Sequence, residues 1–205
     1  MITLIDYGIG NLRSVEKAFE HVGAPVMRTD RPEDLAAAER LVLPGVGAFG
    51  ACAAEVRRRG LVEPIHEAVA RGVPLLGVCV GMQLLFEESE EQGRHAGLGL
   101  LPGRVVRFDG RGEGTTRLKV PHMGWNTAEP QRPSPLLAGL PEAAHFYFVH
   151  SYHVLPSHEA DVLAVCEYGV RFPAIVGRDH VFGVQFHPEK SQHNGLRILE
   201  NFARL

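Results

Sequence analysis

Short apolar runs without polar alternation recur along the chain, and segments with helical spacing separate them. The apolar runs occupy residues 2–5, 25–27, 41–43, 73–78 and 181–186. Helical spacing of apolar residues predicts helices over 14–21, 32–39, 61–71 and 82–89. Uninterrupted apolar strands that alternate with helices are typical of buried parallel strands in βαβ units, so the pattern predicts a doubly wound sheet.

The pattern changes after about Gly93, where strand-like segments follow one another without helices between them. These segments occupy residues 105–108, 116–120, 146–149 and 163–166. We expect them to form an antiparallel extension of the parallel sheet. An amphipathic helix closes the chain, with Leu196, Leu199 and Phe202 on one face.

Length and composition favour one globular domain, with two small domains as the alternative; the candidate motifs below, spread from about residue 45 to residue 189, favour a single domain over residues 1–205. The 205 residues are 45% hydrophobic and 22% charged, which is ordinary globular usage, and a chain of this length can bury a core without disulfides or a structural metal. The formal net charge of −3 gives no general attraction to nucleic acid or to anionic membranes. We therefore expect neither as a partner.

Cysteine usage and the length of the apolar runs indicate a cytoplasmic protein. The cysteines Cys52, Cys79 and Cys166 do not form the even-numbered pattern of a disulfide framework, so a reducing compartment is the simplest setting. The longest uncharged run, residues 72–86, is shorter than the roughly 18 residues that a membrane span needs. An acidic residue already at Asp6 argues against a signal peptide.

Residues 77–81 read GVCVG and lie between a predicted buried strand and a predicted helix. A nucleophile flanked in this way by glycines matches a nucleophile elbow, in which a tight turn presents the side chain at the end of the strand. Cys79 is then the nucleophile, and the backbone N–H of Val80 is one donor of an oxyanion hole. A buried structural cysteine between two glycines is the alternative interpretation.

Residues 187–189 read HPE and follow the last apolar run. Residues two apart in an extended segment project to the same side, and Pro188 restricts His187 towards an extended conformation. His187 is thus placed to take a proton from Cys79 while Glu189 orients the imidazole. A solvated loop histidine beside an incidental glutamate is the alternative. The occurrence of both strand-end motifs in one α/β pattern favours catalysis.

Three other segments carry weaker signals. The turn at residues 44–49 reads PGVGAF and offers backbone N–H groups to complete an oxyanion hole, although an ordinary strand-to-helix turn also fits. Residues 8–13 lack the third glycine of a dinucleotide motif, because Arg13 occupies that position, which argues against NAD. His150 and His153 lie on a strand and turn without a nearby Cys or acidic residue, so we expect no metal.

The elbow and the late H-P-E together resemble the class I, triad-type glutamine amidotransferases, in which a G-x-C-x-G-x-Q elbow carries the nucleophile. Here residues 77–83 read GVCVGMQ. Five further motifs resemble, within that family, the glutaminase subunits of imidazole glycerol phosphate synthase. They are DYGIGNLRS, PGVGAF, PHMGWN, YFVHSY and FHPEKS, at residues 6–14, 44–49, 121–126, 147–152 and 186–191. The resemblance implies a flavodoxin-like α/β fold, with a doubly wound, mostly parallel sheet, helices on both faces and an antiparallel extension.

The resemblance also implies roles for residues outside the triad. Val80 with Gly45, Val46 and Gly47 matches the oxyanion hole, whose turn is often not aligned in this family until the partner binds its own substrate. The residues that match the glutamine site are Gln83, Glu91, Ser151 and Tyr152. The residues that match the face towards a partner subunit are Asn11, Trp125, Tyr147 and Lys190.

The implied activity is hydrolysis of L-glutamine to glutamate and ammonia through a glutamyl thioester on Cys79, without cofactor or metal. The implied partner is a (β/α)₈-barrel cyclase subunit that uses the ammonia to make imidazole glycerol phosphate and aminoimidazole carboxamide ribotide in histidine biosynthesis. The alternatives are a glutaminase subunit of another synthase, for example in pyridoxal phosphate, aminobenzoate or anthranilate synthesis, a stand-alone cysteine hydrolase, and a non-catalytic binding domain. A hydrolase would act on peptides as an isolated chain.

Overall fold

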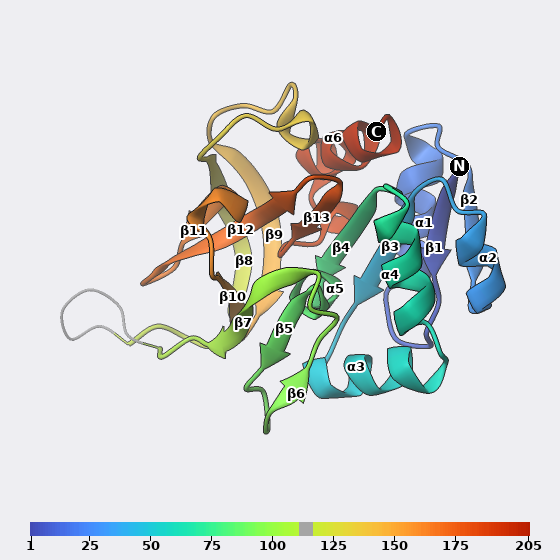
Figure 1. Ribbon diagram of the computed structural model, residues 1–205. Helices are drawn as coiled ribbons and strands as arrows, with labels where there is room; N and C mark the ends of the chain where they lie inside the picture. The colour runs from blue at the N-terminus through green and yellow to red at the C-terminus, as the bar shows by residue number, and fades with distance from the viewer. Residues whose placement is uncertain (111–116) are drawn as a thin grey trace.

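A nine-stranded sheet organises the computed structural model, which describes residues 1–110 and 117–205 (Figure 1). Its first half is parallel, with the strand order β2-β1-β3-β4-β13. These strands are β2 (Val26–Thr29), β1 (Ile2–Ile5), β3 (Leu41–Gly45), β4 (Leu75–Cys79) and β13 (Val181–Val184). Every residue of β1, β3, β4 and β13 is buried, as expected for strands that are covered on both faces. This order is the flavodoxin-like one, which confirms the predicted fold.

The second half of the sheet is antiparallel and continues from β13 in the order β12-β11-β8-β9. Its strands are β12 (Arg171–Arg178), β11 (Val162–Glu167), β8 (His122–Pro130) and β9 (Ala144–His150). The strands predicted at 146–149 and 163–166 are therefore confirmed as an antiparallel extension. Neither β8 nor β12 was predicted, because glycine, proline and charged residues interrupt their apolar pattern.

Helices cover both faces of the parallel half. Figure 1 shows α4 (Val62–Ala70) on one face, whereas α1 (Leu12–His21) and α6 (Gln192–Ala203) lie together on the other. The rings of Phe19 and Phe202 join α1 to α6, with centroids 6.4 Å apart. Two short helices, α2 (Pro32–Ala36) and α5 (Val80–Leu84), follow β2 and β4. The helix α3 (Phe49–Arg58) was not predicted.

A smaller sheet lies beside the parallel strands, and it corrects two predictions. Its order is β10-β7-β5-β6, with β10 (Tyr152–Pro156), β7 (Leu101–Arg107), β5 (Phe86–Ser89) and β6 (His95–Ala96). The helix predicted over 82–89 is wrong, because α5 ends at Leu84 and the chain continues as β5. The strand predicted at 105–108 belongs to this sheet rather than to the extension. Pairing with β7 and burial of Phe86 and Ser89 outweigh the helical propensity of this segment.

The prediction of a strand at 116–120 is also wrong for residues 117–120, which the structure describes. Thr116 lies outside the described residues, and residues 117–120 contain only an isolated bridge at Arg117. Three single turns of 3₁₀ helix complete the described elements, at Pro135–Leu137, Glu159–Asp161 and Pro188–Lys190. Within residues 1–110 and 117–205, no helix is both long and apolar enough to span a membrane.

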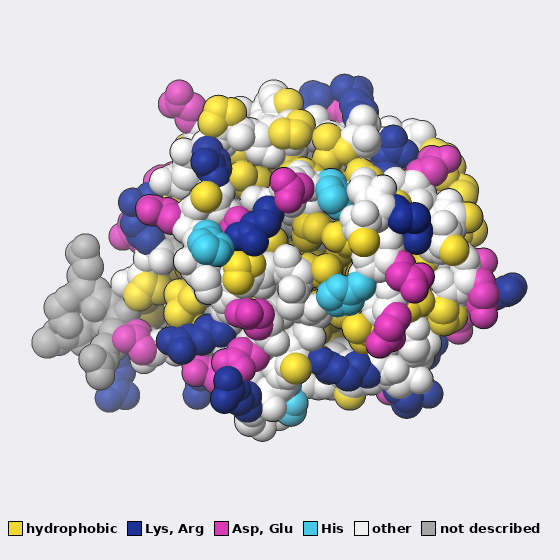
Figure 2. Space-filling view, viewed as in Figure 1, with side chains coloured by type: hydrophobic (Ala, Val, Ile, Leu, Met, Phe, Trp, Pro, Cys, Tyr) yellow, Lys and Arg dark blue, Asp and Glu magenta, His cyan; other side chains and the backbone are white. Residues whose placement is uncertain are grey.

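The outer surface carries charges of both signs. Figure 2 shows Lys and Arg side chains interspersed with Asp and Glu over one face, around a hollowed centre where hydrophobic side chains are visible. The mixed charges on this face agree with the small formal net charge of −3.

Candidate active site

Cys79 ends β4 and precedes α5 in a conformation that favours glycine. Its φ is 55° and its ψ is −112°, which is a sparsely populated region for a residue with a side chain. The neighbouring glycines allow the turn. A Cβ on Gly81 would overlap the carbonyl oxygen of Leu43, and a Cβ on Gly77 would lie 2.6 Å from the carbonyl oxygen of Gly81. The geometry is that of a nucleophile elbow, which bends the chain so that Cys79 faces a cavity.

His187 and Glu189 follow β13, the strand next to β4. The Nδ1 of His187 lies 2.9 Å from the Oε1 of Glu189, and His187 lines the same cavity as Cys79. Both side chains are almost fully buried. The backbone N–H of His187 donates to the carbonyl oxygen of Tyr147 at 3.0 Å, and its carbonyl oxygen accepts from the Ser191 hydroxyl at 2.7 Å. The backbone of His187 is therefore held by hydrogen bonds at both its N–H and its carbonyl oxygen.

Two hydrogen bonds determine the charge of His187. Burial acts to lower the pKa of its imidazole, but the hydrogen bonds with the Cys79 sulphur and the Glu189 carboxylate outweigh burial and raise this pKa to about 10. An imidazolium is therefore favoured at neutral pH. The thiolate is the reactive form of a catalytic cysteine, and Cys79 lines the same cavity as this ring.

A cavity of about 420 Å³ opens over Cys79, within the usual size range of small-molecule sites. Most of the residues predicted for the site line it. They are Val46, Gly47, Cys79, Val80, Gln83, Glu91, Ser151, Tyr152, His187 and Lys190. Gly45 does not line the cavity. It is buried, and a Cβ there would lie 2.7 Å from the backbone nitrogen of Gly81 and 2.9 Å from the hydroxyl of Tyr7.

The amide of Gln83 is fixed by two acceptors. Its Nε2 donates to the carbonyl oxygen of Tyr152 and to the Oε1 of Gln185, both at 3.1 Å. Because both amide hydrogens are used, the atom that Gln83 can offer to a ligand is its Oε1 acceptor. Gln185 in turn donates from Nε2 to the Cys79 sulphur at 3.8 Å. Gln185 was not predicted, although an amide inside the apolar run 181–186 was a signal for it.

Glu91 is anchored at the start of α3. Its Oε2 accepts the backbone N–H of Phe49 at 2.8 Å, and its own N–H donates to the Ser89 hydroxyl at 3.2 Å. A carboxylate at the first turn of a helix is favourably placed, because the first N–H groups of a helix have no partner within it. Glu91 thus presents a negative charge to the cavity from a fixed position.

Buried side chains hold the turn that follows β3. The hydroxyl of Tyr7 donates to the carbonyl oxygen of Pro44 at 2.6 Å, and the thiol of Cys52 donates to the carbonyl oxygen of Val46 at 3.3 Å. Burial raises the pKa of Tyr7 well above 10, and burial also raises the pKa of Cys52, so both groups stay protonated donors at neutral pH. The next residue, Gly47, has a φ of 80°, which favours glycine.

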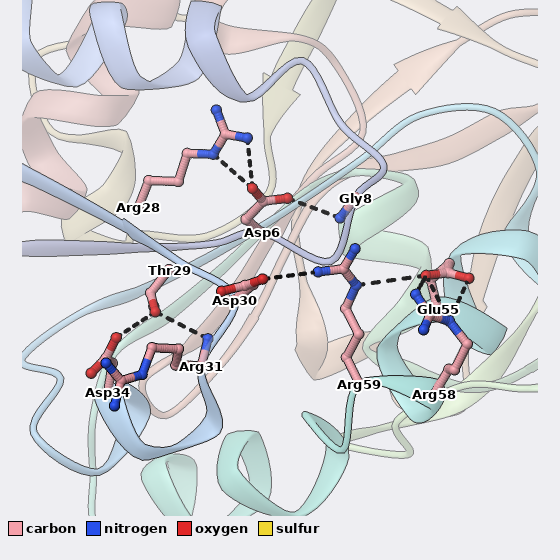
Figure 3. Close-up of polar contacts among 10 residues, drawn as sticks. All are labelled: Asp6, Gly8, Arg28, Thr29, Asp30, Arg31, Asp34, Glu55, Arg58 and Arg59. Atoms are coloured by element: carbon pink, nitrogen blue, oxygen red, sulfur yellow. Dashed lines mark hydrogen bonds and ion pairs between the residues drawn. The ribbon is translucent and has the colours of Figure 1, made fainter.

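The loop between β1 and α1 is held by charged groups, as Figure 3 shows. Asp6 accepts the N–H of Gly8 at 2.9 Å and pairs with Arg28 at 2.6 Å. Burial acts to raise the pKa of Asp6, but the bonds from Gly8 and Arg28 outweigh it and lower this pKa. Arg59 joins the same region by ion pairs with Asp30 at 3.3 Å and Glu55 at 3.6 Å. At the end of this loop, Asn11 donates from Nδ2 to Glu189 Oε1 at 3.2 Å.

Three of the four residues predicted to face a partner lie together on β8, β9 and the adjoining 3₁₀ turn. Trp125 and Tyr147 form a cross-strand pair with ring centroids 6.1 Å apart, and Lys190 Nζ lies 6.0 Å from the Tyr147 ring. Trp125 is 48% exposed and Met123 on the same strand is 65% exposed. Large exposed apolar side chains of this kind are typical of interaction sites.

Comparison with known proteins agrees with this geometry. The family model of class-I glutamine amidotransferases matches residues 3–205. The imidazole glycerol phosphate synthase subunit HisH of Salinibacter ruber is 62% identical over 206 aligned residues, covering 100% of this chain and 94% of the relative. The HisH subunit of Syntrophotalea carbinolica is 56% identical, covering 99% of each.

A solved structure shows the same fold at lower identity. A crystal structure of a glutamine amidotransferase superposes with a TM-score of 0.76 and 22% identity, covering 100% of this chain and 99% of that one. Together with the elbow at Cys79 and the buried His187–Glu189 pair, the full-length matches identify the family: the chain belongs to the class-I glutamine amidotransferases and, within them, to the HisH subunits of imidazole glycerol phosphate synthase.

Proposed function

We propose that this chain hydrolyses L-glutamine through a Cys79–His187–Glu189 triad and passes the ammonia to a (β/α)₈-barrel cyclase partner in histidine biosynthesis. The observation that carries the proposal is the buried His187–Glu189 pair, whose Nδ1 and Oε1 atoms lie 2.9 Å apart, beside a cavity that both His187 and Cys79 line. A nucleophile, a base and an orienting group in line are the minimum for acyl transfer through a covalent intermediate.

The substrate is recognised by groups of matching polarity. The Oε1 of Gln83 accepts a hydrogen bond from an N–H group of glutamine, and the carboxylate of Glu91 attracts its α-ammonium group. Backbone N–H groups near Ser151 and Tyr152 receive the α-carboxylate. This arrangement distinguishes an amino acid with a side-chain amide from an ordinary peptide.

The first half of the reaction forms a thioester. The Cys79 thiolate attacks the side-chain amide carbon, and the carbonyl electrons move to the oxygen. Backbone N–H groups of Val80 and of the turn at residues 46 and 47, which line the cavity, stabilise this oxyanion, and loss of one such donor typically costs about 10²–10³ in rate. The His187 imidazolium then gives its proton to the amide nitrogen, the C–N bond breaks, and ammonia leaves.

The second half returns the enzyme to its starting state. Neutral His187 takes a proton from water, and the hydroxide attacks the glutamyl thioester. The C–S bond breaks, glutamate is released, and the Cys79 thiolate again faces an imidazolium. Ammonia is a nucleophile only while unprotonated, so a closed passage to the partner's active site protects it from bulk water. The exposed Trp125, with Tyr147, Lys190 and Asn11, supplies the face for this heterodimer.

We place the enzyme in the cytoplasm. All three cysteines are buried and free, which suits a reducing compartment. A thiolate nucleophile also needs that compartment, because oxidation of Cys79 would abolish its attack on the substrate.

The test is a glutamine turnover assay with and without the cyclase partner and the partner's nucleotide substrate. We expect slow turnover by the isolated chain and a large increase in kcat when both are added. Turnover of peptides by the isolated chain, with no response to the partner, would instead support a stand-alone cysteine hydrolase. A response to the synthase partner of another pathway would support a different amidotransferase subunit.

A further inference from the structure

A second group of histidines lies beside the cavity but outside the triad. His122, His150 and His153 are all buried, and each packs against the ring of Phe108, with His153 closest at a centroid distance of 4.7 Å. Among the described residues, no group of three or more His, Cys, Asp or Glu side chains is arranged to hold a metal ion.

The hydrogen bonds fix the proton positions on two of the rings. The Nδ1 of His150 lies 2.8 Å from the carbonyl oxygen of Tyr152, and a carbonyl only accepts, so this nitrogen carries a proton. The Nε2 of His150 lies 3.0 Å from the Nδ1 of His122. The Nε2 of His122 in turn lies 3.2 Å from the Asn126 amide nitrogen, which is a donor. His122 is therefore protonated on Nδ1, and its Nδ1–H donates a hydrogen bond to the unprotonated Nε2 of His150.

Both rings are uncharged in this arrangement, since an imidazolium would have two donors and no acceptor. Burial agrees with this assignment, because it lowers the pKa of His122 to about 4 and, with smaller effects from neighbouring groups, the pKa of His150 to about 3. The hydrogen bonds are thus all donated in one direction along this series. Asn126 donates to His122, His122 donates to His150, and His150 donates to the carbonyl oxygen of Tyr152. The state of this series does not change across the neutral pH range.

The series of hydrogen bonds ends at the corner where the protein passes from one sheet to the other. His150 is the last residue of β9, and Tyr152 is the first residue of β10. The carbonyl oxygen of Ser151 accepts the N–H of Phe108 at 3.0 Å, and that of Tyr152 accepts from both His150 and Gln83. Both carbonyls of the corner are therefore directed into the protein. In a trans peptide the N–H points opposite to the C=O, so the orientation of the corner N–H groups is fixed as well.

We propose that His150, held by His122, is a positioning residue for glutamine binding, which fixes the Ser151–Tyr152 corner and the amide of Gln83 through the shared carbonyl of Tyr152. The proposal rests on the proposed function, because it assumes that the cavity binds glutamine. His150 and Gln83 both line this cavity, and Gln83 continues the contacts through Gln185 to the Cys79 sulphur. The carbonyl oxygen of Tyr152 thus fixes the positions of both the Gln83 amide and the Ser151–Tyr152 corner, which bind opposite ends of glutamine.

Kinetics of the complex with the cyclase partner test this role. His150→Leu removes both ring nitrogens, and we expect the KM for glutamine to rise about tenfold, the effect of one lost hydrogen bond, with a smaller change in kcat. His150→Asn keeps a donor at the position of Nδ1 and should restore most of the loss in KM. The control is His153→Leu. His153 is equally buried in the same cluster, but among the described residues its ring is hydrogen-bonded only to the carbonyl oxygen of Val154.

Three outcomes would overturn the proposal. They are an unchanged KM in His150→Leu, an equal rise in KM in His153→Leu, and no rescue by His150→Asn. Synthesis from added ammonia should stay at the wild-type rate in every variant. If the wild-type complex does not use glutamine, the proposed function is wrong. If the wild-type complex uses glutamine and the His150→Leu variant has an unchanged KM, only the role proposed for His150 is wrong.

Nuclear magnetic resonance keeps the proposal testable if a variant does not fold. In the wild-type protein, long-range ¹⁵N–¹H spectra should show His122 and His150 as neutral rings with the proton on Nδ1 from pH 6 to pH 8. A neutral Nε2–H tautomer of His150, or an imidazolium in that range, would contradict the hydrogen-bond direction on which the proposal depends.

Discussion

The side-chain amide of Asn11 donates to the Oε1 of Glu189 at 3.2 Å, although 178 residues separate them in the chain. The same oxygen accepts from the Nδ1 of His187 at 2.9 Å. The other carboxylate oxygen, Oε2, is buried and has no hydrogen-bond partner among residues 1–110 and 117–205. Asn11 therefore connects the loop after β1, a proposed partner contact, directly to the acid of the triad.

Replacement of Asn11 should weaken catalysis at saturating partner. In Asn11→Ala, Glu189 loses one of two hydrogen bonds on Oε1, and we expect kcat for glutamine to fall about tenfold, as for a lost bond to a charged group. Asn11→Asp should be worse, because it sets a second carboxylate beside Glu189. The assay compares glutamine-dependent with ammonia-dependent synthesis. Equal loss of both activities, or none, would show that Asn11 does not act through Glu189.

The protonation of His187 should depend on both of its partners. Its pKa of about 10 lies above the ordinary 6.5, so the imidazolium persists as the pH rises through 7 and 8 and is lost only near 10. Cys79→Ala and Glu189→Gln each remove a contact that raises the pKa, so each variant should release the proton at lower pH. A ¹⁵N titration of His187 measures this directly. A wild-type ring that titrates near 6.5 would contradict the account.

The elbow should not tolerate a methyl group at Gly81. Gly81→Ala forces its Cβ into the carbonyl oxygen of Leu43, so we expect a loss of about 3 kcal/mol or more in unfolding free energy, or no folded protein. Gly72→Ala is the control. Gly72 also has a positive φ, 87°, but no atom of the described residues lies within 4 Å of its added Cβ, so the loss there should be only about 1 kcal/mol. Equal losses by denaturant unfolding would argue against the close packing at the elbow.

Tyr7 should contribute to both stability and catalysis. Tyr7→Phe leaves the buried carbonyl of Pro44 without its donor, which typically costs about 1–3 kcal/mol, and should reduce kcat by loosening the turn at residues 44–47. Tyr168→Phe is matched, because its hydroxyl also donates to a carbonyl, that of Lys119, but at an exposed site. We expect Tyr168→Phe to change neither quantity appreciably. A Tyr7→Phe variant with normal kcat would limit its role to stability.

The sequence predicted those parts of the site that depend on local spacing. The nucleophile elbow and the His-x-Glu motif each follow a strand within a few residues, and neighbouring parallel strands end at the same edge of a sheet. Cys79 and His187 were therefore recognisable from the order of strands alone. The helices α1 and α6 were predictable for a similar reason, because their apolar spacing is regular over several turns.

Features that depend on tertiary pairing were not predictable. Residues 82–89 have helix-forming composition, yet pairing with β7 converts the second half of this segment into β5. The hydrogen bonds of Gln83 and Gln185 join residues that are 69 to 106 positions apart in the chain, from Gln83 to Tyr152 and from Cys79 to Gln185. The amide inside the apolar run 181–186 marks Gln185 as unusual, but no local pattern identifies its partners, because these contacts form only when distant segments of the chain meet.

The central claim is that Cys79 carries the covalent chemistry and that the partner needs only ammonia from this chain. The most direct test is Cys79→Ala in the complex, assayed for cyclase product with glutamine and, separately, with added ammonium salt. We predict a loss of at least about 10³-fold with glutamine, as for removal of a catalytic nucleophile, and an unchanged rate with ammonia. Loss of both activities to the same extent would contradict the account and assign Cys79 a structural role.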